Sequence, residues 1–195
     1  MLTLALALAL QGCPQRIQVT APSARSTTAT MTVSECGTRI LGPWRARVGR
    51  SGLSAHHVEG DGTTPSGTYH IGPVVYGLDP NPGVRLRYHR LVCGDWWDSD
   101  AASPTYNHFR HLACGATPPF NAGEGLWQTT VAYRAFAVID YNAHPVVPGR
   151  GSAIFLHVDT GRPTNGCVAL PRARLLRLLR RLGPGSATIS LAVSE

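Results

Sequence analysis

Short segments with the residue pattern of β-strands constrain the fold of this 195-residue chain more than any other feature. Alternating apolar and polar residues favour a strand with one buried face, and clusters of Gly, Pro, Asn and Asp favour turns. The pattern recurs in six segments: 28–33, 44–49, 67–71, 134–140, 153–158 and 187–193. Six short strands joined by loops predict a mainly β fold, a mixed sheet or sandwich within a single domain.

One segment departs from the β pattern and predicts a helix. Pro171 stands at the first helical position, and Gly183 follows the last apolar residue. Between them one face is apolar and the other is basic: Leu175, Leu176, Leu178, Leu179 and Leu182 against Arg174, Arg177, Arg180 and Arg181. Basic amphipathic helices can also lie on membranes, but a leucine stripe followed by a returning strand favours packing on the sheet.

The middle of the chain, residues 80–127, contains Pro, Gly, Asn and aromatic residues and shows little periodicity. Long ordered loops are commonly the lids or walls of functional sites. Polar residues clustered in a loop rarely serve packing, so five of them are candidates for substrate contact: Asp98, Asp100, Tyr106, Asn107 and Glu124. The aromatic residues have the alternative role of packing the loop.

The net charge of +7 comes with a complete absence of lysine, because all 18 basic residues are arginine. This excludes mechanisms that need a lysine amine, including P-loop phosphate binding, serine and lysine acyl transfer, and Schiff-base catalysis. The arginines are scattered along the chain, so we expect no nucleic-acid partner. The histidines and acidic residues match no zinc or calcium motif, and the near dinucleotide fingerprint at 149–154 lacks its third glycine, so we expect neither metal nor cofactor.

The first residues indicate export. An apolar run over 2–10 is too short for a transmembrane helix of about 20 residues and resembles a secretory signal, although no positive charge precedes it. The run ends at Leu10-Gln11-Gly12-Cys13, which is similar to a lipoprotein signal. Two alternatives therefore stay open: lipidation of Cys13, or cleavage nearby and plain secretion. Both place the protein in the cell envelope, with membrane contact only through this segment.

These patterns divide the chain into three parts. Residues 1–13 are the expected signal, and 28–195 are the expected folded domain. Residues 14–27 are rich in Pro, Ser, Thr and Ala without an apolar period, so we expect a tether.

Five cysteines are an odd set for a chain that meets an oxidising compartment, so at least one is free or modified. Cys93 and Cys114 flank a loop-like stretch, and we expect them to form a disulfide. Two unpaired buried thiols are the alternative. Cys36 has no assignment from its surroundings.

A histidine and a cysteine in the segment 154–170 give the main chemical signal. His157 ends an apolar segment, and Cys167 follows a Gly-containing turn and precedes the expected helix. A thiol with a pKa of about 8.5 is mostly protonated at neutral pH, so a nucleophilic cysteine needs a base within hydrogen-bond reach. Backbone N–H groups around Gly166 can bind the oxyanion of an acyl-transfer intermediate. On these residues alone, a structural buried thiol is the alternative.

The motifs around this pair resemble the L,D-transpeptidase (YkuD-type) catalytic domain of bacterial cell-wall enzymes. The matching stretches span roughly residues 30 to 193 and follow the family's order: Thr64-Pro65-Ser66-Gly67-Thr68-Tyr69, Trp97 to Asp100, Tyr106-Asn107, Glu124 to Trp127, Asp140 to Asn142, Gly149 to Ser152 leading into His157, and Thr164-Asn165-Gly166-Cys167. The pattern is typical of a secreted single-domain branch. The resemblance implies a mainly β domain with a long active-site loop and one amphipathic helix.

The resemblance also implies roles for individual residues. Cys167 matches the nucleophile and His157 the general base, its ring held by the backbone carbonyl of Val158. The amides of Gly166 and Cys167 match the oxyanion hole. Thr164 matches the family's Ser/Thr that holds the turn.

Two positions depart from the family's pattern. Asn165 replaces a usual histidine and Ala169 a usual arginine, so the substrate contacts of those side chains are not carried over. Thr164, Asn165, Tyr106, Asn107, Asp98 and Glu124 are the expected substrate contacts.

The implied activity is acyl transfer on peptidoglycan stem peptides. Attack by an amine would give a cross-link, and attack by water would make the protein an L,D-carboxypeptidase. Inhibition by carbapenems and a monomeric state are expected with it. The alternative is a non-catalytic envelope-binding protein in which a disulfide with Cys36 locks Cys167.

Overall fold

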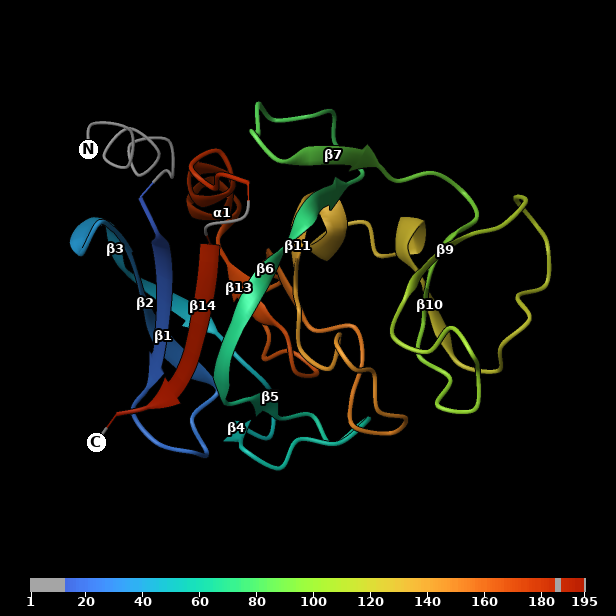
Figure 1. The fold of residues 1–195 in the computed structure, drawn as a ribbon, viewed down its shortest axis with the longest axis horizontal. Coiled ribbons are helices and arrows are strands. Elements are labelled where there is room, and N and C mark those ends of the chain that lie inside the picture. Colours follow the sequence, from blue (N-terminus) through green and yellow to red (C-terminus); the bar gives the residue numbers. More distant parts are fainter. Residues whose placement is uncertain (1–12, 185–186, 195) are drawn as a thin grey trace, which may run out of the picture.

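The computed structural model describes residues 13–184 and 187–194 and shows a mainly β fold with one α-helix in this part, as the segment pattern predicts (Figure 1). The apolar run over 2–10 lies outside the described residues. Within residues 13–184 and 187–194, no helix is long and apolar enough to cross a membrane.

Nine strands form the main sheet of the described chain. In spatial order they are β11 (Phe136–Ile139), β12 (Phe155–Val158), β13 (Val168–Leu170), β3 (Thr38–Arg47), β2 (Thr28–Glu35), β1 (Gln15–Ala21), β14 (Ala187–Val193), β6 (Gly67–Gly77) and β7 (Arg87–Arg90). The long strand β6 pairs with β14 through Gly67 to His70 and with β11 through Ile71 to Tyr76. This second pairing connects two distant parts of the sheet, so the sheet curves around a core.

The core lies inside this curved sheet and beneath the helix. Alternate residues of β1 and β2 point inward, as period-two side-chain direction requires: Ile17, Val19 and Ala21, with Ala29, Met31 and Val33. The helix α1 (Arg172–Leu179) packs against β12 and β13. Its leucine stripe is buried as expected, and Leu182 is buried although the helix ends at Leu179.

The expected strands exist, but several have other boundaries. Two expected strands have correct or nearly correct bounds: 187–193 is β14, and 28–33 is β2 without its last two residues. The segment at 44–49 is the end of the longer β3, and that at 67–71 is the first half of β6. Residues 134–140 and 153–158 contain the shorter strands β11 and β12.

The prediction of a tether over 14–27 is wrong for Gln15–Ala21, because these residues form the strand β1. This strand pairs in parallel with β14 along its whole length and antiparallel with β2. Its sequence alternates Ile17, Val19 and Ala21 with polar neighbours, a strand pattern that the Pro, Ser and Thr content of the surrounding segment masks. The folded domain therefore begins before residue 28.

The middle segment forms a separate lobe with more regular structure than its sequence indicates (Figure 1). Besides β7 it contains a small sheet with the order β10 (Gly123–Gly125), β8 (Asp95–Asp98), β9 (Phe109–His111). The buried carboxylate of Asp95 stabilises this lobe by accepting hydrogen bonds from Val92 N at 2.9 Å, His89 Nε2 at 2.8 Å and His111 Nδ1 at 2.7 Å. Two short 3₁₀ helices, η2 (Leu126–Gln128) and η3 (Ala132–Arg134), connect the lobe to β11, and β4 (Leu53–Ser54) pairs with β5 (Thr64–Pro65) before it.

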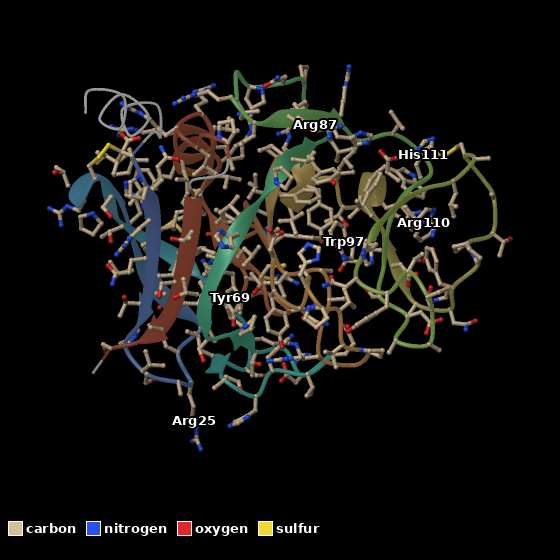
Figure 2. The ribbon with its side chains drawn as sticks, in the orientation of Figure 1. Arg25, Tyr69, Arg87, Trp97, Arg110 and His111 are labelled. Atoms are coloured by element: carbon tan, nitrogen blue, oxygen red, sulfur yellow. A yellow bond between two sulfur atoms is a disulfide. The ribbon has the colours of Figure 1, made fainter. Side chains whose placement is uncertain are left out.

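Two disulfides are present, visible as yellow bonds in Figure 2. Cys93 pairs with Cys114, which confirms the expected pair and closes the lobe. Cys13 pairs with Cys36, a cysteine for which the sequence pattern indicates no partner. A sulfur in a disulfide cannot carry a lipid, so this pairing contradicts lipidation of Cys13. It also contradicts a disulfide between Cys36 and Cys167, because Cys167 is free.

We predict one titratable thiol per chain when the protein is unfolded without reduction. Four of the five cysteines are in disulfides, so only Cys167 should react with a thiol reagent. Proteolysis without reduction, followed by mass spectrometry, should yield linked peptides for Cys13 with Cys36 and for Cys93 with Cys114. A linked peptide that contains Cys167, or three free thiols, would contradict the structure.

Candidate active site

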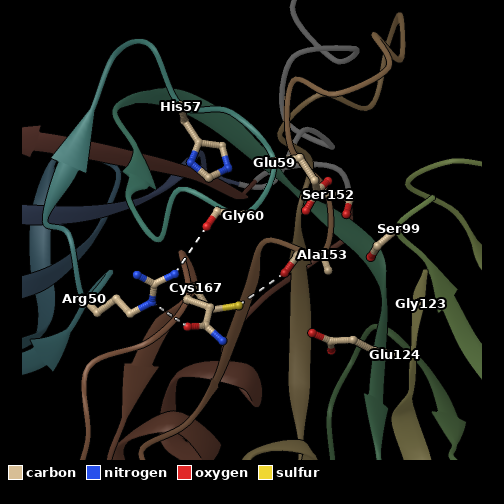
Figure 3. Close-up of a pocket in the computed structure, with 11 residues that line it drawn as sticks. Arg50, His57, Glu59, Gly60, Ser99, Gly123, Glu124, Ser152, Ala153 and Cys167 are labelled. Carbon is tan, nitrogen blue, oxygen red and sulfur yellow. Dashed lines mark hydrogen bonds between the residues drawn. The ribbon is translucent and has the colours of Figure 1, made fainter. Parts of the chain in front are cut away.

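A cleft of about 290 Å³ opens beside Cys167 (Figure 3). Its walls come from four parts of the chain that are far apart in the sequence. The 50–60 segment supplies Arg50, His57 and Glu59; the lobe supplies Ser99 and Glu124; the segment before β12 supplies Ser152 and Ala153; and the turn before β13 supplies Asn165 and Cys167.

The turn that presents Cys167 is fixed by Thr164 and Gly166. Thr164 Oγ1 donates a hydrogen bond to Cys167 O at 2.6 Å and accepts one from Gly166 N at 3.2 Å. Gly166 has a φ of +139°, and a Cβ at this position would lie 2.9 Å from Thr63 O, so only glycine fits. Thr164 thus holds the turn in the way that the resemblance implies, and its buried side chain does not line the cleft.

His157 lies in β12, the strand next to the one that follows Cys167. The parallel register of β12 and β13 places His157 opposite Ala169, and β11 covers its other edge. Its Nδ1 lies 2.8 Å from Val158 O, as expected. Because a carbonyl oxygen only accepts, Nδ1 carries the proton and Nε2 is left as the acceptor. Burial lowers the pKa of His157, against smaller opposing effects from Val158 and Asp159, so the ring is a neutral base.

Cys167 is half-buried, and its sulfur is held by two backbone groups. Sγ donates to Ala153 O at 3.3 Å and accepts from Phe155 N at 3.3 Å. Removal of the thiol from water, together with the nearby Glu124 carboxylate, raises the pKa of Cys167 to about 12. Among the described residues, His157 and Cys167 make no hydrogen bond to each other. The resting site therefore contains a neutral thiol in the turn before β13 and a neutral imidazole on the adjacent strand β12.

Ala153, which accepts the thiol hydrogen bond, has an unusual backbone conformation. Its φ is +54°, a left-handed value that disfavours residues with a Cβ. Asn107 stabilises this conformation because its Oδ1 accepts a hydrogen bond from Ala153 N at 3.1 Å. Strained backbone of this kind persists where surrounding contacts fix it, and it occurs often at functional sites.

Three of the expected substrate contacts bind other parts of the protein instead. Asn107 Oδ1 also accepts from Trp97 Nε1 at 3.0 Å, and its Nδ2 donates to the carbonyls of Tyr141 and Asn142. Tyr106 is buried, and its hydroxyl donates to Glu59 and accepts from Gly151 N.

The third is Asp98, which is fully buried. Its carboxylate accepts hydrogen bonds from Ser103 Oγ at 2.5 Å and Thr105 Oγ1 at 2.6 Å, and it fixes a turn of the lobe. Asp98, Tyr106 and Asn107 are therefore corrected from substrate contacts to residues that position the walls of the cleft. Asp100, another candidate, accepts hydrogen bonds from Asn121 and does not line the cleft.

Glu124 and Asn165 do line the cleft, as expected of substrate contacts. The Asn165 amide oxygen accepts a hydrogen bond from Arg50 Nε at 3.1 Å, and Arg50 also donates to Gly60 O at 3.3 Å. Both bonds are drawn in Figure 3.

Sequence reasoning missed Arg50, His57 and Glu59 as part of the site. The imidazole Nδ1 of His57 lies 3.0 Å from both Thr63 Oγ1 and Asp61 Oδ1, so its orientation is fixed. No cluster of three side chains able to hold a metal ion occurs in the described part of the chain.

We predict that replacing Asn107 with glycine lowers the free energy of unfolding by about 3 kcal/mol, because four hydrogen bonds are lost. Glycine accepts the φ of +60° at this position, so the change removes the side chain without adding backbone strain. Urea unfolding measures the effect. The control is Asn121→Gly in the exposed part of the lobe, expected to lose about 1 kcal/mol or less. Equal losses in the two variants would contradict the role of Asn107.

Comparison with known proteins identifies the family of the chain. Residues 21–190 match the YkuD family, described as the L,D-transpeptidase catalytic domain. The match covers the main sheet from the end of β1 to the middle of β14 and includes every wall of the cleft. No curated protein and no solved structure gives a significant match. Because the match extends over most of the chain, the protein belongs to the YkuD family of L,D-transpeptidase catalytic domains.

Proposed function

We propose that this protein is a peptidoglycan L,D-transpeptidase in which the thiol of Cys167 forms a thioester with a donor stem peptide. One observation carries the proposal. The only free thiol of the described chain lies in the cleft, directly before β13. The neighbouring strand, β12, contains the neutral, buried imidazole of His157. The two disulfides fit a protein that works in an oxidising compartment outside the cytoplasm.

The thiol proton must move during the attack on the substrate. In the resting site the thiol donates to Ala153 O, and its pKa of about 12 keeps it protonated. A bound donor peptide displaces this contact, and His157 Nε2 accepts the proton while sulfur attacks the carbonyl of the L,D bond. The C–S bond forms, the C–N bond breaks, and the proton passes from His157 to the departing amine of the terminal D-residue.

The developing negative charge on the carbonyl oxygen needs a donor. Among the described residues, the Gly166 amide already donates to Thr164 Oγ1, whereas the Cys167 amide has no acceptor. We therefore assign the Cys167 amide as the primary oxyanion donor. The Gly166 amide joins it when its hydrogen bond to Thr164 Oγ1 breaks. The thioester is then resolved by an amine, which gives a cross-link, or by water, which makes the protein an L,D-carboxypeptidase.

The sequence left open a non-catalytic protein with Cys167 locked to Cys36. Cys36 is already paired with Cys13, so that form of the alternative is contradicted.

We predict that a carbapenem adds its mass to the native protein but not to Cys167→Ala, because the adduct requires the thiol. His157→Gln retains the thiol but cannot accept its proton, so adduct formation should slow by about 100-fold or more. Intact-protein mass spectrometry measures both effects. Native protein whose single thiol titrates but that gains no mass would overturn the proposal, and muropeptide analysis with purified sacculi separates cross-linking from carboxypeptidase action.

The pKa shifts predict how the rates depend on pH. His157 must be neutral to accept the proton, and burial lowers its pKa below the ordinary 6.5, so donor acylation should persist below pH 6.5 and fall only as His157 becomes protonated. Cys167 has a pKa of about 12, so alkylation by iodoacetamide should keep rising above pH 9, where an ordinary thiol has levelled off. An alkylation rate that is half-maximal near pH 8.5 would show that the thiol is not desolvated.

A further inference from the structure

Two carboxylates, Glu59 and Glu124, line the same cleft as Cys167 and come from different parts of the chain. Figure 3 shows both on the side of Cys167 opposite Arg50. Neither forms a salt bridge with any described residue, although the chain contains 18 arginines and carries a net charge of +7. An uncompensated acidic wall in a basic protein indicates a cationic ligand.

Each carboxylate is held in place by a buried tyrosine. The hydroxyl of Tyr106 donates to Glu59 Oε2, and that of Tyr133 donates to Glu124 Oε2. Burial raises the pKa of both tyrosines, so the hydroxyls stay protonated and keep donating. Each tyrosine occupies one carboxylate oxygen, and Oε1 of both glutamates has no partner among the described residues.

A third group in the same wall lacks a partner. Ser152 is only 7% exposed, yet its Oγ makes no hydrogen bond within the described structure. A buried hydroxyl without a partner is unfavourable and calls for an explanation, and here the hydroxyl lines the cleft beside Ala153 (Figure 3). A ligand that donates a hydrogen bond would satisfy it.

We propose that Glu59, Glu124 and Ser152 form a subsite for a primary aliphatic ammonium group, the acceptor amine of a second stem peptide. The assignment rests on the proposed function. An ammonium group has three N–H donors and no acceptor, which matches two carboxylate oxygens and one hydroxyl oxygen. Arg50 lies on the other side of Cys167, and its positive charge repels a cation. Only the side with the two carboxylates is therefore suited to an ammonium group.

The subsite also accounts for the protons of the second half-reaction. The bound ammonium must lose a proton before its nitrogen can attack the thioester carbonyl. Glu124 can accept it, because desolvation and the neighbouring Glu59 raise the pKa of Glu124 and make it a better base than an ordinary carboxylate. As the C–N bond forms and the C–S bond breaks, His157 transfers a second nitrogen proton to sulfur. The proton on Glu124 returns to solvent when the product leaves.

The test measures how the thioester partitions between an added amine and water. The donor is a tetrapeptide stem whose own side-chain amine is acetylated, so it cannot act as acceptor. The ratio of amide to hydrolysis product does not depend on how fast the thioester forms. In Glu59→Gln and Glu124→Gln, the side-chain amide oxygen can still accept the tyrosine hydrogen bond, but the charge is lost.

We expect each single variant to lower this ratio about tenfold for a primary alkylamine, and the double variant to lower it further. Ser152→Ala should lower it by a smaller factor. Hydroxylamine is neutral at pH 7.5, so its ratio of aminolysis to hydrolysis product should be the same in the native protein and in every variant. Glu35→Gln, at the end of β2, is the control for loss of one negative charge outside the cleft. An unchanged alkylamine ratio, or an equal loss for hydroxylamine, would overturn the subsite.

A direct binding measurement separates this proposal from the proposed function. Titration of n-pentylammonium into the native protein, followed by NMR, should show saturable binding that the double variant loses. Binding of the ammonium without thioester formation would support the subsite and contradict the proposed transpeptidase function. Thioester formation without binding would support the proposed function and contradict the subsite. The absence of both would reject both.

Discussion

The pairing of β6 with β11 is the interaction on which the active site depends. Without it, β11 would be an exposed edge of the main sheet, next to β12. With it, all four residues of β12 are buried, including His157. A histidine in that position has no water to stabilise a positive charge, so it stays neutral and its free nitrogen is a base. The curvature of the sheet thus determines the protonation state of His157, the group that we propose as the base for the thiol.

The second requirement is that the 50–60 segment reaches the turn of Cys167. Arg50 N donates to Thr164 O at 2.7 Å, and Thr164 N donates to Val48 O at 3.0 Å. These two backbone hydrogen bonds form an isolated bridge between Gly49 and Thr164. They bring a wall of the cleft to residues more than one hundred positions away in the chain. No local sequence pattern encodes such a contact, which is why Arg50, His57 and Glu59 could not be predicted.

The sequence predicted those features that depend on local patterns or on a family motif. Alternation located β2 and β14, the leucine stripe located α1, and the Thr164 to Cys167 motif located the candidate nucleophile. The sequence did not predict the features that contacts between distant parts of the chain determine. The three residues of β13 are too few to show a period, and Cys13 meets Cys36 only because β1 and β2 pair with Gln15 opposite Glu35. Asn107 and Asp98 looked like ligand contacts because loop sequences do not show which backbone groups need a hydrogen-bond partner inside the protein.

The central parallel pair of β1 and β14 has a consequence for how the domain is made. The first and the last strand of the described sheet lie side by side, along seven paired residues. The sheet therefore stays open until the last strand has left the ribosome, and contacts of such long sequence separation form slowly. Until β14 is available, the edges of β1 and β6 that pair with it stay without partners, so the incomplete chain presents two open strand edges.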